Sequence, residues 1–146
     1  QDFLETWGKN WRKTAPSHFL DIFNSKGRHL PENRKHVVIL NRILADVYNK
    51  GYETNQNLIL DNVNDVPVES LEHLNNLLLK ARKENVQLVR FLFKPADISI
   101  IMEFNELPRA QLRIARHYGI PMEDFWGMTD VMENPASFEQ KTTPSK

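Results

Sequence analysis

The strongest constraint on the fold is an amphipathic helix expected at residues 71–83, with short strand-like segments on both sides of it. Ser70 is suited to the N-cap position, and Glu72 places a negative charge in the first turn, where it complements the helix dipole. The apolar residues of this helix recur at helical spacing and form one stripe: Leu71, Leu74, Leu77 and Leu78. A chain that sets one such helix among several strands is expected to have an α+β fold.

Two strands are expected before this helix. Residues 36–44 contain an unbroken apolar run from Val37 to Leu40, which is typical of a strand buried on both faces. A helical turn that ends at Gly51 follows. The second strand is expected from Leu58 to Val63, and Asn64–Asp65 forms the turn that ends it.

Two more strands and a helix are expected after it. Residues 87–93 and 98–104 have strand patterns, and the turn sequence at 94–97 joins them. Pro108 suits the first turn of a helix that continues to Tyr118, and Gly119 ends it. This order of elements predicts a small, mostly antiparallel sheet.

The two ends of the chain differ in character. Residues 1–24 have apolar residues at spacings of three and four and are expected to be helical. Pro16 interrupts this pattern, and Ser17 is a candidate N-cap for a second short helix. Residues 133–146 are polar and contain two prolines, which is typical of a disordered tail.

These patterns divide the chain into three parts. Residues 1–35 are expected to be a helical extension and loop that belong to the same domain as residues 36–125. Residues 126–146 are expected to be a C-terminal tail, partly disordered.

Composition excludes several classes of function. The 19 basic and 19 acidic residues cancel, whereas a nucleic-acid-binding protein usually has a basic excess. Because the chain has no cysteine, it has neither disulfides nor thiolate zinc sites. Its five histidines have no metal-like spacing, and no apolar run is long enough for a transmembrane helix.

Catalytic motifs are missing as well. The serines lack the Gly-x-Ser-x-Gly setting of a nucleophile, and the chain has neither a phosphate-binding loop nor a dinucleotide glycine pattern. We therefore expect no catalytic residue, no metal and no cofactor.

Several short segments follow one another in a characteristic order: Val37-Val38-Ile39-Leu40, Gly51-Tyr52-Glu53, Asn64-Asp65, Ser70-Leu71-Glu72-His73-Leu74 and Ile120-Pro121. This order resembles a PDZ domain of the Deg/HtrA (protease Do-like) serine proteases. The closer match is to the C-terminal PDZ of the plant-type and related bacterial branch, and the resemblance covers residues 1–125.

The resemblance implies a PDZ-like antiparallel sheet or partial barrel with flanking helices and added N- and C-terminal helices. It also implies a non-catalytic part of a serine endopeptidase whose catalytic domain lies upstream. The expected partners are proteins, peptides or other subunits of the protease. A location in the bacterial periplasm or cell envelope, or in an organelle, is suggested by the resemblance alone.

The chain departs from this family in the part that grips a ligand. It has no Gly-Leu-Gly-Phe-like segment to hold a peptide carboxylate, so the binding strand is expected to precede Gln1. The helix at 71–83 corresponds to the groove helix, and His73, Asn76 and Lys80 share one side of it. These three residues are the peptide-groove candidates, although each is also an ordinary choice for a solvent-exposed helix face.

Three tryptophans are the interface candidates: Trp7, Trp11 and Trp126. Packing inside the chain is the alternative for the first two. Three functions stay open at this point: an assembly or regulatory module, a module that binds substrate C-termini, and a free-standing adaptor. The missing binding strand and the N-terminal aromatics favour the first.

Overall fold

The structure is a computed structural model that describes residues 2–25, 34 and 36–121. Its strands are β1 (Ile39–Arg42), β2 (Gln56–Val63), β3 (Val66–Pro67), β4 (Leu88–Lys94) and β5 (Ile98–Glu103). Its α-helices are α1 (Asp2–Glu5), α2 (Trp11–Thr14), α3 (Ser17–Asn24), α4 (Leu71–Lys83) and α5 (Leu107–Tyr118). Two short 3-10 helices are η1 (Val47–Asn49) and η2 (Phe104–Glu106).

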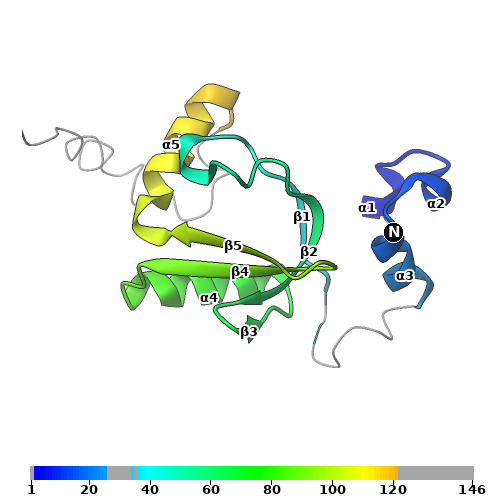
Figure 1. The fold of residues 1–146 in the computed structure, drawn as a ribbon, viewed down its shortest axis with the longest axis horizontal. Coiled ribbons are helices and arrows are strands. Elements are labelled where there is room, and N and C mark those ends of the chain that lie inside the picture. Colours follow the sequence, from blue (N-terminus) through cyan, green and yellow to red (C-terminus); the bar gives the residue numbers. More distant parts are fainter. Residues whose placement is uncertain (1, 26–33, 35, 122–146) are drawn as a thin grey trace, which may run out of the picture.

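The strands form one open antiparallel sheet in the order β1-β2-β4-β5, with β3 paired to β2 (Figure 1). The expected α+β class is therefore confirmed. The turn between β2 and β3 is the expected one: Asn64 and Asp65 both have positive φ, at 47° and 67°. Two consecutive residues with positive φ are what a tight hairpin turn requires, and Asn and Asp tolerate this conformation better than most residues.

Helix α4 has the expected bounds. Ser70 caps it, because the Ser70 hydroxyl accepts a hydrogen bond from the backbone N–H of His73 at 3.0 Å. Leu78 is buried in the main core and Leu74 is half-buried against it, beside strand residues that include Val89. One part of the expected stripe is wrong: Leu71 is 68% exposed, because it lies in the first turn, beyond the core.

The first strand also differs from expectation. Strand β1 covers only Ile39–Arg42, and its side chains are half-buried or exposed rather than buried on both faces. The reason is its place in the sheet: β1 stands at one edge, where a strand has a neighbour on one side only.

The N-terminal helices form a second cluster on the face of the sheet opposite α4. The buried residues of this cluster are Leu4, Trp11, Ala15, Phe19 and Ile59. The last of these belongs to β2 and joins the helices to the sheet. A ring nitrogen of His18 (Nε2) lies 2.8 Å from the carbonyl oxygen of Asn57 and adds a polar contact between the two parts. Ser17 does not cap α3 as expected: Pro16 holds the N-cap position and Ser17 is already helical.

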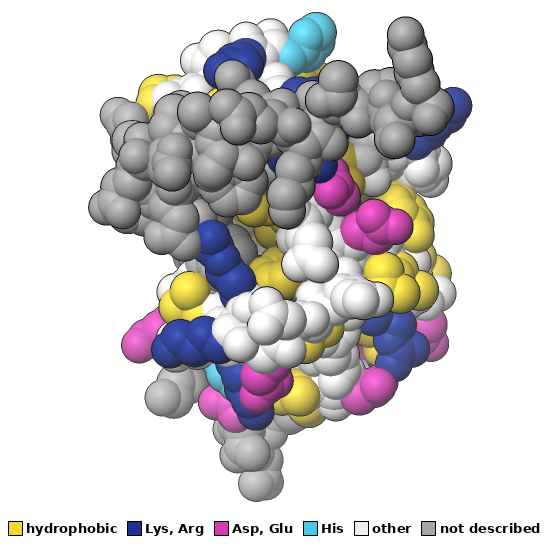
Figure 2. Space-filling model, turned by 90° about the vertical axis from the view of Figure 1, so that its left-hand side faces the viewer, with side chains coloured by type: hydrophobic (Ala, Val, Ile, Leu, Met, Phe, Trp, Pro, Cys, Tyr) yellow, Lys and Arg dark blue, Asp and Glu magenta, His cyan; other side chains and the backbone are white. Residues whose placement is uncertain are grey.

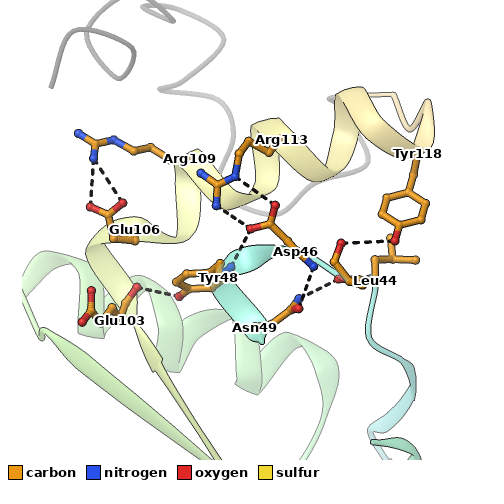
Figure 3. A network of polar contacts seen from close by, with 10 residues as sticks. Leu44, Asp46, Tyr48, Asn49, Glu103, Glu106, Arg109, Arg113 and Tyr118 are labelled. Carbon is orange, nitrogen blue, oxygen red and sulfur yellow. Dashed lines mark hydrogen bonds and ion pairs between the residues drawn. The ribbon is translucent and has the colours of Figure 1, made fainter. Parts of the chain in front are cut away.

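The opposite edge of the sheet is covered by the loop that follows β1. The Tyr48 hydroxyl donates to the carbonyl oxygen of Glu103 at 2.7 Å, and the backbone N–H of Ile101 donates to the Tyr52 hydroxyl at 3.4 Å. Arg113 of α5 pairs with Asp46 in the same loop (Figure 3). The two tyrosine contacts occupy main-chain groups on the outer edge of β5. The β5 edge is therefore covered by the chain's own loop, whereas the β1 edge is not paired to another described strand.

Helix α5 ends as expected at Gly119, which has a positive φ of 65°. Among residues 2–25, 34 and 36–121, no helix is both long enough and apolar enough to span a bilayer. On the face that Figure 2 shows, acidic and basic side chains of the described residues are interspersed.

Candidate functional site

A groove runs between the segment entering β1 and the first turns of α4. Its first part is a hollow of about 480 Å³, lined by His36, Val37, Val38, Ile39, Ser70, Leu71 and Glu72. Its second part is a hollow of about 540 Å³ along α4, lined by Leu71, Glu72, Leu74, Asn75 and Leu78. Because the two hollows share Leu71 and Glu72, we treat them as one site and call it the α4 groove.

Among the residues that the structure describes, no strand pairs with the outer edge of β1, which forms the other wall of this groove. Strand β1 pairs with β2, and Leu60 donates its backbone N–H to the carbonyl oxygen of Val38 at 2.9 Å. Main-chain groups alternate in direction along an antiparallel strand, so those of Ile39 and Asn41 face away from β2. An edge of this kind can accept an added strand.

One hydrogen bond links this wall to the start of α4, and one ion pair links it to β2. The backbone N–H of His36 donates to the carbonyl oxygen of Glu69 at 3.0 Å, immediately before the cap of the helix. The Arg34 guanidinium donates to the carbonyl and carboxylate oxygens of Asp61, at 3.0 and 2.9 Å. The Arg34 side chain is only 5% exposed, so this pair is a buried anchor.

The groove is mainly apolar along α4, and its polar groups are few. Ser70 already caps the helix. Within the described part of the chain, the side-chain oxygen of Asn75 is buried and has no hydrogen-bond donor. The Glu72 side chain lines both hollows and is exposed. Among residues 2–25, 34 and 36–121, no cation pairs with Glu72.

The groove candidates from the sequence lie on other parts of α4. The Nδ1 atom of half-buried His73 accepts from the backbone N–H of Glu69 at 3.3 Å, which ties the ring to the helix start. Asn76 is exposed, and Lys80 lines a different hollow beside Leu77. A role for these residues in ligand binding stays a prediction. The groove side of α4 carries Leu71, Asn75 and Leu78, whose spacings of four and three residues define one helix face.

The tryptophan candidates that the structure describes pack within the N-terminal cluster. Trp11 is 4% exposed and meets the Phe23 ring edge-to-face at 5.0 Å. Half-buried Trp7 meets the Phe3 ring edge-to-face at 5.0 Å. Trp126 lies outside the described residues. Contact of any of the three with another chain stays a prediction.

The serines of the described part have structural surroundings. Ser25 donates from its hydroxyl to the carbonyl oxygen of Ile22 at 3.0 Å, and Ser70 is the α4 cap. Ser17 begins α3 and Ser99 lies exposed on β5. In the part of the chain that the structure describes, no group of three His, Asp or Glu side chains is arranged to hold a metal ion. The groove can thus bind, through strand addition and apolar contacts, but carries no visible apparatus for covalent chemistry.

Comparison with known proteins gives the family. Residues 1–124 match the PDZ domain family, so the match includes the N-terminal helices as well as the sheet. Among curated proteins, the chain is similar to protease Do-like 13 of Arabidopsis thaliana, with 30% identity over 87 residues. That alignment covers 53% of this chain and 18% of the relative, so it spans less than a fifth of the relative's length. Since the family match covers well over half of the 146 residues, the chain belongs to the PDZ domain family, in a form that resembles the PDZ domain of a Do-like protease.

Proposed function

We propose that this PDZ domain is a non-catalytic module of a Deg/HtrA-type serine endopeptidase, and that it acts in assembly of the protease or in regulation of its proteolysis. The observation that carries the proposal is the pairing of an open β1 edge with the apolar face of α4. A strand from another chain segment could add to β1 and place alternate side chains against Leu71 and Leu78.

The N-terminal cluster supports the assembly role. The rings of Phe3, Trp7 and Phe19 contact one another, and the Phe23 ring meets Trp11. A small hollow of about 150 Å³ remains between α1, α3 and β1. Large aromatic side chains are enriched at protein interfaces, where they bury much area at little entropic cost. Trp7 is only half-buried by the chain itself, so part of its ring is available to contact a second subunit.

A second candidate function is capture of substrate C-termini in the same groove, and a third is that of a free-standing adaptor domain. The 68% exposure of Leu71 favours a groove that is open to incoming ligands. Assembly and capture make opposite demands on the ligand. Assembly requires an internal segment or a folded surface, whereas capture requires a free terminal carboxylate.

The test compares the two demands directly. The protein is titrated with short labelled peptides that have a free C-terminus, in parallel with its Leu71→Ala variant. Its oligomeric state is measured by sedimentation with and without Trp7→Ala. The assembly role predicts weak or absent binding of free C-termini and a Trp7-dependent association. Micromolar binding of free C-termini that Leu71→Ala weakens would replace assembly with capture.

A further inference from the structure

Two side chains of α4 bring hydrogen-bond acceptors to the groove. Glu72 contributes a carboxylate to both hollows, and Asn75 contributes an amide oxygen that lacks a donor. Both are hydrogen-bond acceptors, and one carries a negative charge. A ligand that complements them must bring donors and positive charge.

The described residues around Glu72 do not supply this positive charge. The N-terminus of α4 attracts negative charge, but the Ser70 hydroxyl and the Glu72 carboxylate are already there. Arg34, which precedes the β1 segment, pairs with Asp61, so its charge is already matched. Glu69 adds a second acidic residue next to the cap, and His36 is the titratable group of the facing segment. A terminal carboxylate entering this end of the groove would meet the charge of Glu72.

Asn75 lacks a partner in a place where a ligand can supply one. A buried acceptor without a donor destabilises the fold, so native proteins rarely keep one without a reason. The oxygen itself lies beneath the surface, while the half-exposed side chain lines the groove. The terminal torsion of Asn is soft, and rotation about it would turn the oxygen outward to accept from a bound backbone N–H.

We infer that the α4 groove recognises an internal, extended segment that carries Lys or Arg next to a large apolar residue. The apolar side chain would cover Leu71 and Leu78, the cation would pair with Glu72, and a backbone N–H would reach Asn75. Charge complementarity selects this occupant over a free C-terminus. The inference rests on the proposed function, since it names the partner of the same groove.

The experiment uses peptides of alternating sequence that are acetylated and amidated, so that neither end is charged. They have Leu at the centre and Lys, Gln or Glu beside it, and each also exists with a free C-terminus. Fluorescence anisotropy with the full 146-residue chain gives the affinities. The capped Lys peptide should bind about fivefold more tightly than the Gln peptide, the upper range for one exposed ion pair. The preference should shrink at high salt.

Two substitutions and one control test which groove residues are responsible for the peptide preference. Glu72→Lys should reverse the order so that the Glu peptide binds best, whereas Glu84→Lys, the same change at the other end of α4, should leave it unchanged. Asn75→Leu should weaken binding of all peptides by about two- to tenfold, the value of one hydrogen bond. The same substitution should leave the thermal midpoint unchanged or raise it, because it removes an unsatisfied acceptor.

The outcomes separate this inference from the proposed function. Binding with equal affinity for Lys, Gln and Glu peptides, or tighter binding of free C-termini that Glu72→Lys strengthens, would overturn the inference while leaving the groove as a binding site. Absence of binding for every peptide, capped or free, would overturn the groove itself. A fall in thermal midpoint with Asn75→Leu would show that Asn75 stabilises the fold and would contradict its role in ligand binding.

Discussion

Arg113 on α5 holds the carboxylate of Asp46, 67 residues earlier in the chain, through two hydrogen bonds: Nη2 to Oδ1 at 2.6 Å and Nε to Oδ2 at 3.1 Å (Figure 3). The same carboxylate accepts from the backbone N–H of Tyr48 and so caps η1. The hydrogen bond from Arg113 holds the pKa of Asp46 below its ordinary value, with the Tyr48 N–H and the charge of Arg113 acting in the same direction against burial. One carboxylate thus ties the loop after β1 to the last helix.

This pairing predicts a loss of stability in acid. Because the pKa of Asp46 is lower in the folded state, its contribution is fully present above the unfolded value of about 3.9 and is lost as the pH falls through the lower folded value. Asp46→Asn should reduce stability at neutral pH and flatten the acid limb of a plot of unfolding free energy against pH. Asp65→Asn is the matched control, since its carboxylate pairs with Arg90 but is 79% exposed. Superimposable acid limbs for the wild type and Asp46→Asn would contradict this account.

The elements that were predicted correctly from the sequence are those whose determining residues lie within their own segments. Helix α4 was located at its actual bounds because its cap and its apolar stripe lie within its own segment. The turn at Asn64–Asp65 was located because those two residue types tolerate positive φ. The apolar run at β1 predicts a strand buried on both faces, but the same run also occurs in a strand at the edge of a sheet. Only the pairing of the strands distinguishes the two places.

The groove residues could not be found from the sequence for a related reason. Leucine spacing indicates which residues of α4 share a stripe, but not how far the sheet extends along it. The exposure of Leu71 therefore does not follow from its place in the stripe. Asn75 lines the hollow along α4. The segment that enters β1 is tied to β2 by Arg34 and Asp61, which are 27 residues apart, and no local pattern in the sequence indicates such a contact.

Truncation of α4 leucines should separate core from groove. Leu78→Ala removes a side chain that is 9% exposed and packed in the main core, so we expect a loss of about 2–5 kcal/mol in unfolding free energy. Leu74→Ala should cost less, because Leu74 is only half-buried. Leu71→Ala should change stability least of the three. Denaturant unfolding of the three variants gives the order, and an equal cost at all three positions would mean that the helix face has been assigned wrongly.

We expect Tyr48 to stabilise the folded domain at neutral pH and to lose this stabilising effect in alkaline solution. Burial, helped by the charges of Glu103 and Glu106, raises the pKa of Tyr48 to about 12. Its contribution is therefore fully present below the unfolded value of about 10 and is lost as the pH rises toward 12. Tyr48→Phe should cost about 1 kcal/mol at neutral pH, because the bond to the Glu103 carbonyl is lost, and should remove the alkaline slope. Tyr118→Phe, at a 42% exposed position, is the control. Tyrosinate absorbance that is complete well below pH 12 would disagree with this value.

The chain should have no proteolytic activity of its own. In the described part of the chain, Ser25 and Ser70 make structural hydrogen bonds, and no serine hydroxyl is bonded to a histidine ring. Nucleophilic catalysis needs such a base within hydrogen-bond reach of the nucleophile. Incubation with labelled casein should release no more fragments than a blank. Cleavage that survives repurification and the loss of every serine would require a catalytic group of another kind.

Ile59 should determine whether the N-terminal helices stay on the sheet. Its side chain is 5% exposed and is the member of the N-terminal cluster that comes from β2. Ile59→Ala should therefore weaken the attachment of α1–α3 by about 2–5 kcal/mol, the usual cost of a large truncation in a packed site. Leu60→Ala is the matched control, because Leu60 lies next to it on the strand but packs into the main core on the other face.

The two substitutions should differ in what they expose before global unfolding. With Ile59→Ala, Trp11 should become accessible in the native state, so tryptophan emission should shift to the red and trypsin should cut faster after Arg12 and Lys13. With Leu60→Ala, the whole domain should lose stability while native emission stays unchanged. If Ile59→Ala left both emission and cleavage rate at wild-type values, the N-terminal helices would be held by contacts such as His18 with Asn57 rather than by the apolar cluster.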